Sequence, residues 1–194
     1  MHIEEDISVR GLQNYYAMLV SGQTSGDAGP DRPQSPEKPV VLTPKEIYEI
    51  ALGKQPGNKQ AALAGFRHFG HVLGDALATI LVLVDGIAVL GGGIAGAYRL
   101  FAPSMITAMK AAFQSSEGRT IPRLPAGLFD LEDEKEAEAF LKGNMRTLEI
   151  PGTEQTIDFD VRFRTGVALS RLGTSRAISA GAFRYALDQL GLAL

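Results

Sequence analysis

The sequence predicts an α/β fold, because amphipathic helical patterns flank a short apolar strand that ends in three consecutive glycines. The strand is expected over residues 87–90, where Ile87 and Val89 are β-branched. Glycines lie on both sides of it, which is typical of a strand buried on both faces. We therefore expect residues 87–90 to lie inside a sheet, with helices packed on that sheet.

Size and composition indicate one domain with an ordinary hydrophobic core. The chain has 194 residues, of which 45% are hydrophobic and 21% are charged, and these values suit a single globular unit over residues 1–194. The formal net charge of −3 implies no basic face, so nucleic acid is not an expected partner. The chain has no cysteines, which excludes disulfides and thiolate zinc sites.

The N-terminal part contains one predicted helix and one predicted loop. Apolar residues recur at helical spacing over residues 5–20, and acidic residues crowd the first turn, where the helix dipole favours them. Residues 21–41 are rich in Pro, Gly, Ser and Asp, so we expect a flexible surface insertion there. The N-terminus lacks the charged and apolar regions of a signal peptide, which makes the cytoplasm the expected location.

A short helix is predicted after this insertion. Thr43 and Glu46 have the spacing of a capping box, in which each side chain bonds a backbone amide at the start of the helix. Pro44 suits the first helical position because its missing N–H would have no partner there. Gly53 is the expected end of this helix.

A long helix is predicted to follow, with Asn58 as its N-cap and an end near residue 84. Its apolar stripe comprises Leu63, Phe66, Phe69, Leu73, Leu77 and Ile80. Gly70 and Gly74 have no side chains, so we expect that their face of the helix can press closely against another backbone.

The chain after the glycines is predicted to continue with both helices and strands. A helix is expected over residues 97–113. Proline kinks a helix or marks its start, so Pro103 leaves one helix and two shorter ones equally open. Residues 115–128 are expected to be irregular. The remaining predicted elements are a charged helix at 131–142, strands at 147–150, 156–163 and 167–170, and a final helix at 174–190 capped by Thr174 or Ser175.

The apolar stretch 73–96 is open to three interpretations. A membrane span needs about 20 apolar residues, but Asp85 and the glycines interrupt this stretch and no basic cluster flanks it, so a membrane is not an expected partner. Gly91, Gly93 and Gly96 satisfy the G-x-G-x-x-G fingerprint of a dinucleotide-binding Rossmann unit, yet no convincing second strand follows. The third interpretation is a nucleotide site in a kinase-like lobe.

A resemblance to the ROK family (repressors, open reading frames and sugar kinases) favours the third interpretation. The family pattern is a helix ending in L-G-x-x-L-A-x-L and an apolar strand ending in V-L-G-G-G. Leu73, Gly74 and Leu77 fit the helix, and residues 89–93 read VLGGG. The resemblance extends over roughly residues 43–113. It implies the C-terminal lobe of an actin-like (ribonuclease H-like) sugar kinase, an incomplete sheet with helices packed on it.

The resemblance also implies that the glycine turn contacts a nucleotide. In the family this turn lies beside the adenosine end of ATP, so Gly91, Gly92, Gly93 and Ile94 are the expected cofactor-binding residues, with ATP and Mg as the cofactors of the complete enzyme. Glycines let the backbone approach a ligand closely, and free N–H groups at the start of the next helix favour an anion. The alternative is a tight strand-to-helix turn that binds nothing.

Glu4 is the expected sugar-binding residue. In the family, a zinc motif ending in G-C-x-E is followed four residues after the glutamate by a serine, and Glu4 with Ser8 fits that tail. The family glutamate accepts hydrogen bonds from sugar hydroxyls; the alternative is an acid that stabilises the helix dipole. The cysteines of the family motif are absent, so no zinc site is expected. His68 and His71, three residues apart, are expected to belong to a polar helix face rather than a metal site.

No catalytic residue is expected in this chain. The family's phosphate loop D-x-G-G-T and its N-D aspartate base do not occur in the sequence, and phosphoryl transfer needs phosphate binding, a metal and a positioned base. We therefore expect part of an ATP-dependent hexose kinase that works with a missing N-terminal lobe. Exposed apolar surface should also promote homo-oligomers. The alternatives are a non-catalytic regulatory module of a ROK-type repressor and, less favoured, an NAD-type Rossmann domain.

Overall fold

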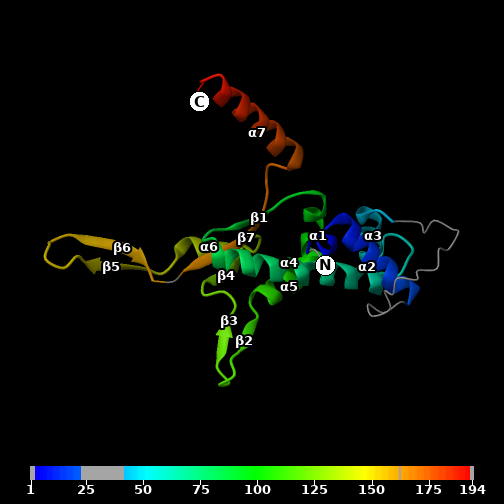
Figure 1. Cartoon of the computed structure of the whole chain (residues 1–194), viewed down its shortest axis with the longest axis horizontal. Helices are drawn as coiled ribbons and strands as arrows, with labels where there is room; N and C mark the ends of the chain where they lie inside the picture. Colours follow the sequence, from blue (N-terminus) through cyan, green and yellow to red (C-terminus); the bar gives the residue numbers. More distant parts are fainter. Residues whose placement is uncertain (1–2, 23–41, 162, 193–194) are drawn as a thin grey trace. The chain divides into compact units, whose positions relative to one another are not determined.

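The computed structural model describes residues 3–22, 42–161 and 163–192. The chain divides into two compact units; Figure 1 labels the helices and strands of both. The helical unit comprises Met1–Ile80 and Ala97–Arg123, and the sheet unit comprises Leu81–Gly96 and Leu124–Leu194. The surface insertion predicted over residues 21–41 lies outside the described residues from residue 23 onward.

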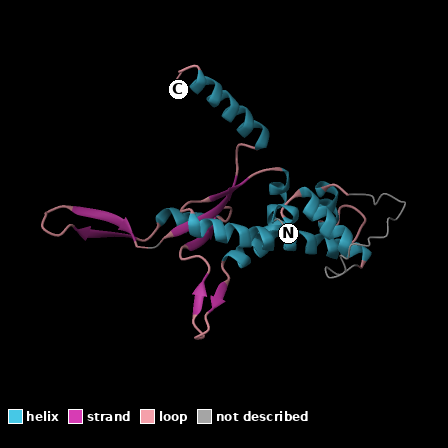
Figure 2. Cartoon of the chain, viewed as in Figure 1, coloured by secondary structure: helices cyan, strands magenta, loops and turns pink. Residues whose placement is uncertain are grey.

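The described residues of the helical unit form five α-helices and a hairpin (Figure 2). Its elements are α1 Ile3–Asp6, α2 Val9–Ser21, α3 Pro44–Ala51, α4 Lys59–Leu83, α5 Tyr98–Met109, β2 Ala112–Gln114 and β3 Thr120–Pro122, with the last three residues of α4 assigned to the sheet unit. The largest fully buried side chains of its core are Leu12, Ile47, Ile50, Phe66, Phe101, Met105 and Met109. No helix among the described residues is long and apolar enough to cross a membrane.

The N-terminal helix predicted over residues 5–20 is two helices, α1 and α2. Ser8 separates them in an extended conformation, with φ −105° and ψ 171°, and its hydroxyl accepts a hydrogen bond from the Gly11 amide at 3.1 Å. A Cβ on Gly11 would lie 2.2 Å from the Glu5 carbonyl oxygen. The single-helix prediction was wrong because Ser8 acts as an N-cap, a role that serine prefers over the helix interior.

Helix α3 confirms the predicted capping box. The Glu46 amide donates to the Thr43 hydroxyl at 3.3 Å, and the Thr43 amide donates to the Glu46 carboxylate at 2.6 Å. The Thr43 backbone amide is the largest cause that lowers the pKa of the exposed Glu46 carboxyl, and the Thr43 hydroxyl, 2.7 Å from the same oxygen, is the second. Both hydrogen bonds favour the ionised carboxylate.

Helices α4 and α5 lie side by side (Figure 1), and two glycines of α4 allow their backbones to approach closely. A Cβ on Gly70 would lie 2.2 Å from the Phe101 carbonyl oxygen, and one on Gly74 would lie 2.3 Å from the Met105 carbonyl oxygen. The predicted close approach of this face is confirmed. The Asn58 cap is confirmed as well, since its side-chain oxygen accepts from the Ala61 amide at 3.0 Å.

Helix α5 is one helix that contains Pro103 in its interior and ends at Met109, four residues before the predicted end. The hairpin of β2 and β3 follows, so the prediction of an irregular segment at 115–128 was wrong. The chain reverses between the two strands at Gly118, which has a φ of +78° and donates to the Ser115 carbonyl at 2.9 Å. A turn with left-handed backbone is a natural position for glycine.

The sheet unit contains a three-stranded parallel sheet in the order β1-β7-β4. Its elements are β1 Ala88–Leu90, the 3₁₀-helix η1 Gly93–Ala97, β4 Gly127–Asp130, α6 Glu134–Lys142, β5 Met145–Glu149, β6 Thr156–Asp160, β7 Arg164–Leu169 and α7 Thr174–Gln189. In the centre of the sheet, Val167 is fully buried and pairs with Ala88 on one side and Asp130 on the other. The helix predicted over residues 131–142 starts three residues later, after the N-cap Asp133.

Strand β1 lies at an edge of this sheet, so the expectation that it is buried on both faces was wrong. Within the described residues it pairs with β7 alone, and Val89 is 62% exposed. β-branched residues favour a strand conformation, but they do not determine whether the strand lies at the centre or at the edge of a sheet. The mixed helices and small sheets nevertheless agree with the predicted α/β class.

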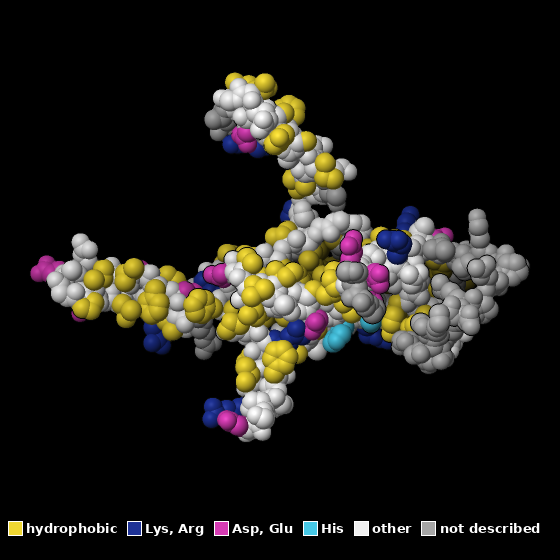
Figure 3. Space-filling model, viewed as in Figure 1, with side chains coloured by type: hydrophobic (Ala, Val, Ile, Leu, Met, Phe, Trp, Pro, Cys, Tyr) yellow, Lys and Arg dark blue, Asp and Glu magenta, His cyan; other side chains and the backbone are white. Residues whose placement is uncertain are grey.

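Two elements of the sheet unit expose apolar side chains, as Figure 3 shows in yellow. The predicted strands around Pro151 and Gly152 form the antiparallel β5–β6 hairpin, in which Leu148 pairs with Ile157 and both are about half exposed, at 51% and 54%. The α7 helix exposes its largest side chains too. Those of Ile178, Phe183 and Tyr185 are 67–71% exposed. Neither Thr174 nor Ser175 caps α7, because its N-cap position is Gly173.

The α4–α5 contact predicts that Gly70→Ala lowers the free energy of unfolding by about 3 kcal/mol, because the added methyl group meets backbone atoms that cannot rotate away. Urea unfolding monitored by circular dichroism measures this change. Gly65→Ala in the same helix is the matched control, since its Cβ would meet only the flexible end of Leu12 at 3.3 Å. Equal effects of the two substitutions would contradict the proposed role of Gly70.

The capping box predicts that Thr43→Ala lowers the free energy of unfolding by about 1 kcal/mol at pH 7. A group whose pKa is lowered by folding stabilises the fold above its unfolded value and loses that contribution as the pH falls. The stability difference between the wild type and Glu46→Gln should therefore be present at pH 7 and shrink below pH 4.5. A difference that is constant from pH 7 to pH 3 in urea unfolding would count against this role.

Candidate functional site

The candidate site lies at the carboxyl edge of the parallel sheet. Because β1, β7 and β4 all run in the same direction, their carboxyl ends meet at one edge. The segments that follow them are the glycine turn at 91–94, Ser170 with Arg171, and Leu131 with Glu132. Open α/β sheets bind ligands in the crevice outside the carboxyl ends of their strands.

The glycine turn presents open backbone at this edge. Gly92 has a φ of +97°, a conformation that residues with a Cβ rarely adopt, and a Cβ on Gly92 or Gly93 would meet no atom within 4 Å. A Cβ on Gly91 would only touch the Ser170 side chain at 3.6 Å. Among the described residues, no acceptor bonds the amides of Gly91, Gly92 and Gly93. The turn therefore has both room and free donors for a ligand.

The turn leads into the five-residue 3₁₀-helix η1 before α5 starts at Tyr98. The helix predicted from residue 97 starts at Tyr98, and the 3₁₀-helix before it was not predicted. The Rossmann alternative needs a strand, a helix and a second parallel strand beside the first. Instead, β1 pairs with β7, and the strand after α5 belongs to the antiparallel β2–β3 hairpin.

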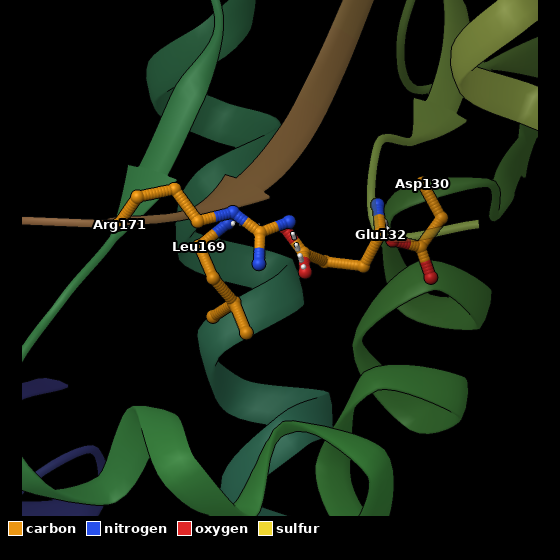
Figure 4. A network of polar contacts seen from close by, with 4 residues as sticks. All are labelled: Asp130, Glu132, Leu169 and Arg171. Atoms are coloured by element: carbon orange, nitrogen blue, oxygen red, sulfur yellow. Dashed lines mark hydrogen bonds and ion pairs between the residues drawn. The ribbon is translucent and has the colours of Figure 1, made fainter. Parts of the chain in front are cut away.

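Glu132 closes the edge between β4 and β7 (Figure 4). Its carboxylate accepts from the Leu169 amide at 2.9 Å and from the Arg171 guanidinium at 3.0 Å and 3.2 Å. Strand β4 ends at Asp130, and its last backbone bond to β7 runs from the Leu131 amide to the Val167 carbonyl. The Glu132 side chain therefore supplies the acceptor that a longer β4 would have supplied from its backbone.

Asp130, the last residue of β4, is the second acid at this edge (Figure 4). Its carboxylate accepts from the Glu132 amide at 3.0 Å, and its own amide donates to the Glu136 carboxylate at 2.6 Å. The edge thus combines free glycine amides, a cation and two carboxylates, a set that can bind an anion and hydroxyl groups.

Asp130, Glu132 and Arg171 were missed by the sequence analysis. The only available signal was the pair of acids in residues 130–132, directly after the apolar residues Leu128 and Phe129. The segment up to Leu128 was expected to be irregular. Strand β4 was not predicted, because its four residues are too few to show an alternating pattern. Its role became visible only through pairing with β7, more than thirty residues later.

Glu4 lies in α1 of the helical unit and is exposed. Ser8, four residues later, is the N-cap of α2, so the two residues of the sugar-binding signature occupy the start of one short helix and the cap of the next. The glycine turn belongs to the sheet unit. The role of Glu4 in binding sugar therefore stays a prediction.

His68 and His71 lie on α4, where the structure gives His68 two partners from other helices. The His68 ring stacks on Tyr15, with centroids 4.0 Å apart, and its Nε2 is 3.6 Å from the Asp6 carboxylate. Across the described ranges, no group of three or more His, Cys, Asp or Glu side chains could hold a metal ion.

The hydrogen bond from the Leu169 amide to the Glu132 carboxylate predicts that Glu132→Ala lowers the free energy of unfolding by about 2 kcal/mol, because that amide loses its acceptor. Arg171→Ala, the matched control, should cost less than about 1 kcal/mol, since Arg171 is 80% exposed. Urea unfolding and hydrogen exchange of the Leu169 amide measure both effects. Equal losses of unfolding free energy in the two variants would show that the Glu132–Arg171 ion pair, and not the hydrogen bond from the Leu169 amide, stabilises this edge.

Comparison with known proteins gives one informative match. No protein-family model and no curated protein matches the sequence. A crystal structure of a glucokinase from Parabacteroides distasonis is 35% identical, with a TM-score of 0.75, over 96% of this chain and 46% of that protein. A candidate sugar kinase from Cytophaga hutchinsonii is 19% identical, with a TM-score of 0.45, over 94% of this chain and 44% of the other.

The chain spans about half the length of the glucokinase that it matches. The predicted relation to sugar kinases is confirmed by that match, since it covers nearly every residue of this chain in both sequence and fold. This chain therefore has the sequence and the fold of part of a sugar kinase.

Proposed function

We propose that this chain is the C-terminal lobe of a ROK-type, ATP-dependent hexose kinase and provides the nucleotide side of its active site. The observation that carries the proposal is the 35% identity to a glucokinase over 96% of this chain. The helix and strand motifs that resemble the ROK family lie within α4 and at the end of β1. An actin-like (ribonuclease H-like) lobe accounts for helices packed on an incomplete sheet.

The geometry of the glycine turn supports a role in nucleotide binding. Gly91, Gly92, Gly93 and Ile94 would hold ATP through backbone atoms, because the turn is exposed and its glycine amides bond no described residue. ATP with Mg would supply the phosphoryl group that is transferred. The residues of the turn would bind and orient the nucleotide, and any side chain at Gly92 or Gly93 would enter the open space that the ligand needs.

The chain alone is not expected to be catalytic. Its 194 residues contain neither the phosphate loop nor the aspartate base of the family, and these groups position the reacting atoms in phosphoryl transfer. The proposed partner is an N-terminal lobe that carries both. Glu4 would add one acceptor for sugar hydroxyls, as the family resemblance implies.

Exposed apolar side chains support the idea of a partner lobe. Leu148 and Ile157 on the β5–β6 hairpin and Phe183 on α7 are more than half exposed. An isolated two-stranded hairpin is marginally stable in water unless another surface covers its apolar face. Contacts with a second lobe, or with a second copy of this chain, would cover these residues.

The test is binding of ATP to the purified chain, measured by ligand-observed NMR with Mg present. We expect a dissociation constant near 1 mM, about −4 kcal/mol, because most charged phosphate contacts would come from the other lobe. Gly93→Val should weaken ATP binding at least tenfold, because the valine side chain would occupy the space that the nucleotide needs. The substitution should not strain the backbone, since Gly93 has no positive φ and its Cβ would meet no atom within 4 Å.

Gly92→Val should weaken binding as well, and Gly118→Val is its matched control. Both glycines have positive φ and open surroundings, but Gly118 lies in the β2–β3 turn. Circular dichroism checks the fold of each variant. Unchanged ATP binding by folded Gly93→Val would show that the glycine turn is a packing feature. Saturable sugar binding without any ATP binding would favour the repressor-type module, and turnover of glucose by the chain alone would overturn the non-catalytic assignment.

A further inference from the structure

The helical unit contains a hollow that the proposed kinase function does not use. Its volume is about 530 Å³, and it is lined by side chains from α2, α4 and α5. The polar and aromatic ones are Tyr15, Arg67, His68, His71, Ser104 and Thr107. The hollow is wide open to solvent and has room for a small ligand. In the view of Figure 3, histidine side chains (cyan) lie at the surface.

Three nitrogen-bearing side chains of α4 line the hollow, and two of them have no partner in the described part of the chain. Arg67 and His71 are exposed and make no hydrogen bond or ion pair with any described residue. The guanidinium of Arg67 is always charged and carries five N–H donors. A histidine ring donates at least one N–H in either protonation state. These donors are available to a ligand without breaking an existing contact.

The opposite wall of the hollow, from α5, adds a further donor. The Ser104 hydroxyl is half-buried and has no hydrogen-bond partner in the described part of the chain. The Thr107 hydroxyl is different, because it already donates to the Pro103 carbonyl at 2.7 Å and keeps only acceptor capacity. Of the two hydroxyls on this wall, Ser104 is therefore the one that can donate to an anion.

The remaining wall fixes the shape of the hollow. The Tyr15 ring of α2 stacks on the His68 ring with an angle of 2° between them, and the Asp6 carboxylate of α1 also contacts His68. The Asp6 carboxylate lies 3.6 Å from the His68 Nε2 and does not line the hollow. No carboxylate lines the hollow itself. An anion would consequently meet donors from α4 and α5 without a repelling charge among the lining side chains.

We propose that this hollow binds a phosphate group, with Arg67, His71 and Ser104 as its donors. Arg with additional N–H and O–H donors is the usual recognition set for phosphate oxygens. The hollow is larger than a phosphate ion, so a small phosphate monoester fits it, with its organic part against Tyr15 and Pro103. The phosphate is the shared chemistry of the free ion and of a sugar phosphate, and titration with each separates the two sources.

The experiment titrates the full chain with inorganic phosphate, glucose 6-phosphate and glucose at constant ionic strength, in a buffer free of phosphate. Histidine ring signals in proton–carbon NMR spectra report binding, and His71→Gln assigns the signal of His71. We expect both phosphates to shift that signal in a saturable way and glucose to leave it unchanged. Tighter binding of the ester than of the free ion assigns the site to a phosphate monoester, and equal binding assigns it to free phosphate.

Arg67→Gln should raise the dissociation constant for phosphate about tenfold, because one charge-assisted pair is lost. Arg99→Gln is the matched control. It removes the same charge from an exposed position of α5 that does not line the hollow, and should change the constant less than twofold. Both sites are at the surface, and circular dichroism confirms that the variants are folded. Equal effects of the two substitutions, or shifts that do not saturate, would overturn the proposal.

Discussion

The contact between α4 and α5 is the constraint on which the helical unit depends. Gly70 and Gly74 bring two helix backbones so close that a methyl group would overlap a carbonyl oxygen. The aromatic pair of Phe69 and Phe101 packs beside this contact, with ring centroids 5.2 Å apart. The chain between these two helices carries β1 and the glycine turn of the sheet unit. The same packing places the residues of α4 and α5 that form the hollow opposite one another.

The sheet unit depends on a different interaction, the parallel pairing of β7 with both β1 and β4. These strands are short, so backbone bonds alone do not complete the edge where they end. Glu132 extends the ladder with a side chain and joins the Leu169 amide to Arg171. The result is an edge with charged groups beside a glycine turn whose amides bond no described residue. Such an edge suits ligand binding because the polar groups are already in place before the ligand arrives.

The proposed function accounts for both the exposed surfaces of the sheet unit and the absence of the family's catalytic groups from this sequence. Under the proposed function, a second lobe would cover the exposed apolar side chains of the β5–β6 hairpin and of α7. This chain also lacks the phosphate loop and base that phosphoryl transfer requires. Binding on the nucleotide side and assembly with a second lobe are therefore parts of one proposal, whereas the hollow in the helical unit stands on separate residues.

The sequence by itself determined the features that depend on neighbouring residues. The Thr43 capping box, the Asn58 cap and the small-residue face of Gly70 and Gly74 were predictable, because caps and helix faces follow from spacing along the chain. The three glycines after a strand located one part of the candidate site. The relation to sugar kinases followed from the same local pattern.

Only the tertiary structure decided which strands pair and which residues become exposed. The position of β1 at an edge, the joining of Glu132 to Leu169 and Arg171, and the stacking of Tyr15 on His68 all involve residues far apart in the sequence. Such pairings depend on long-range packing, and no spacing along the chain encodes them.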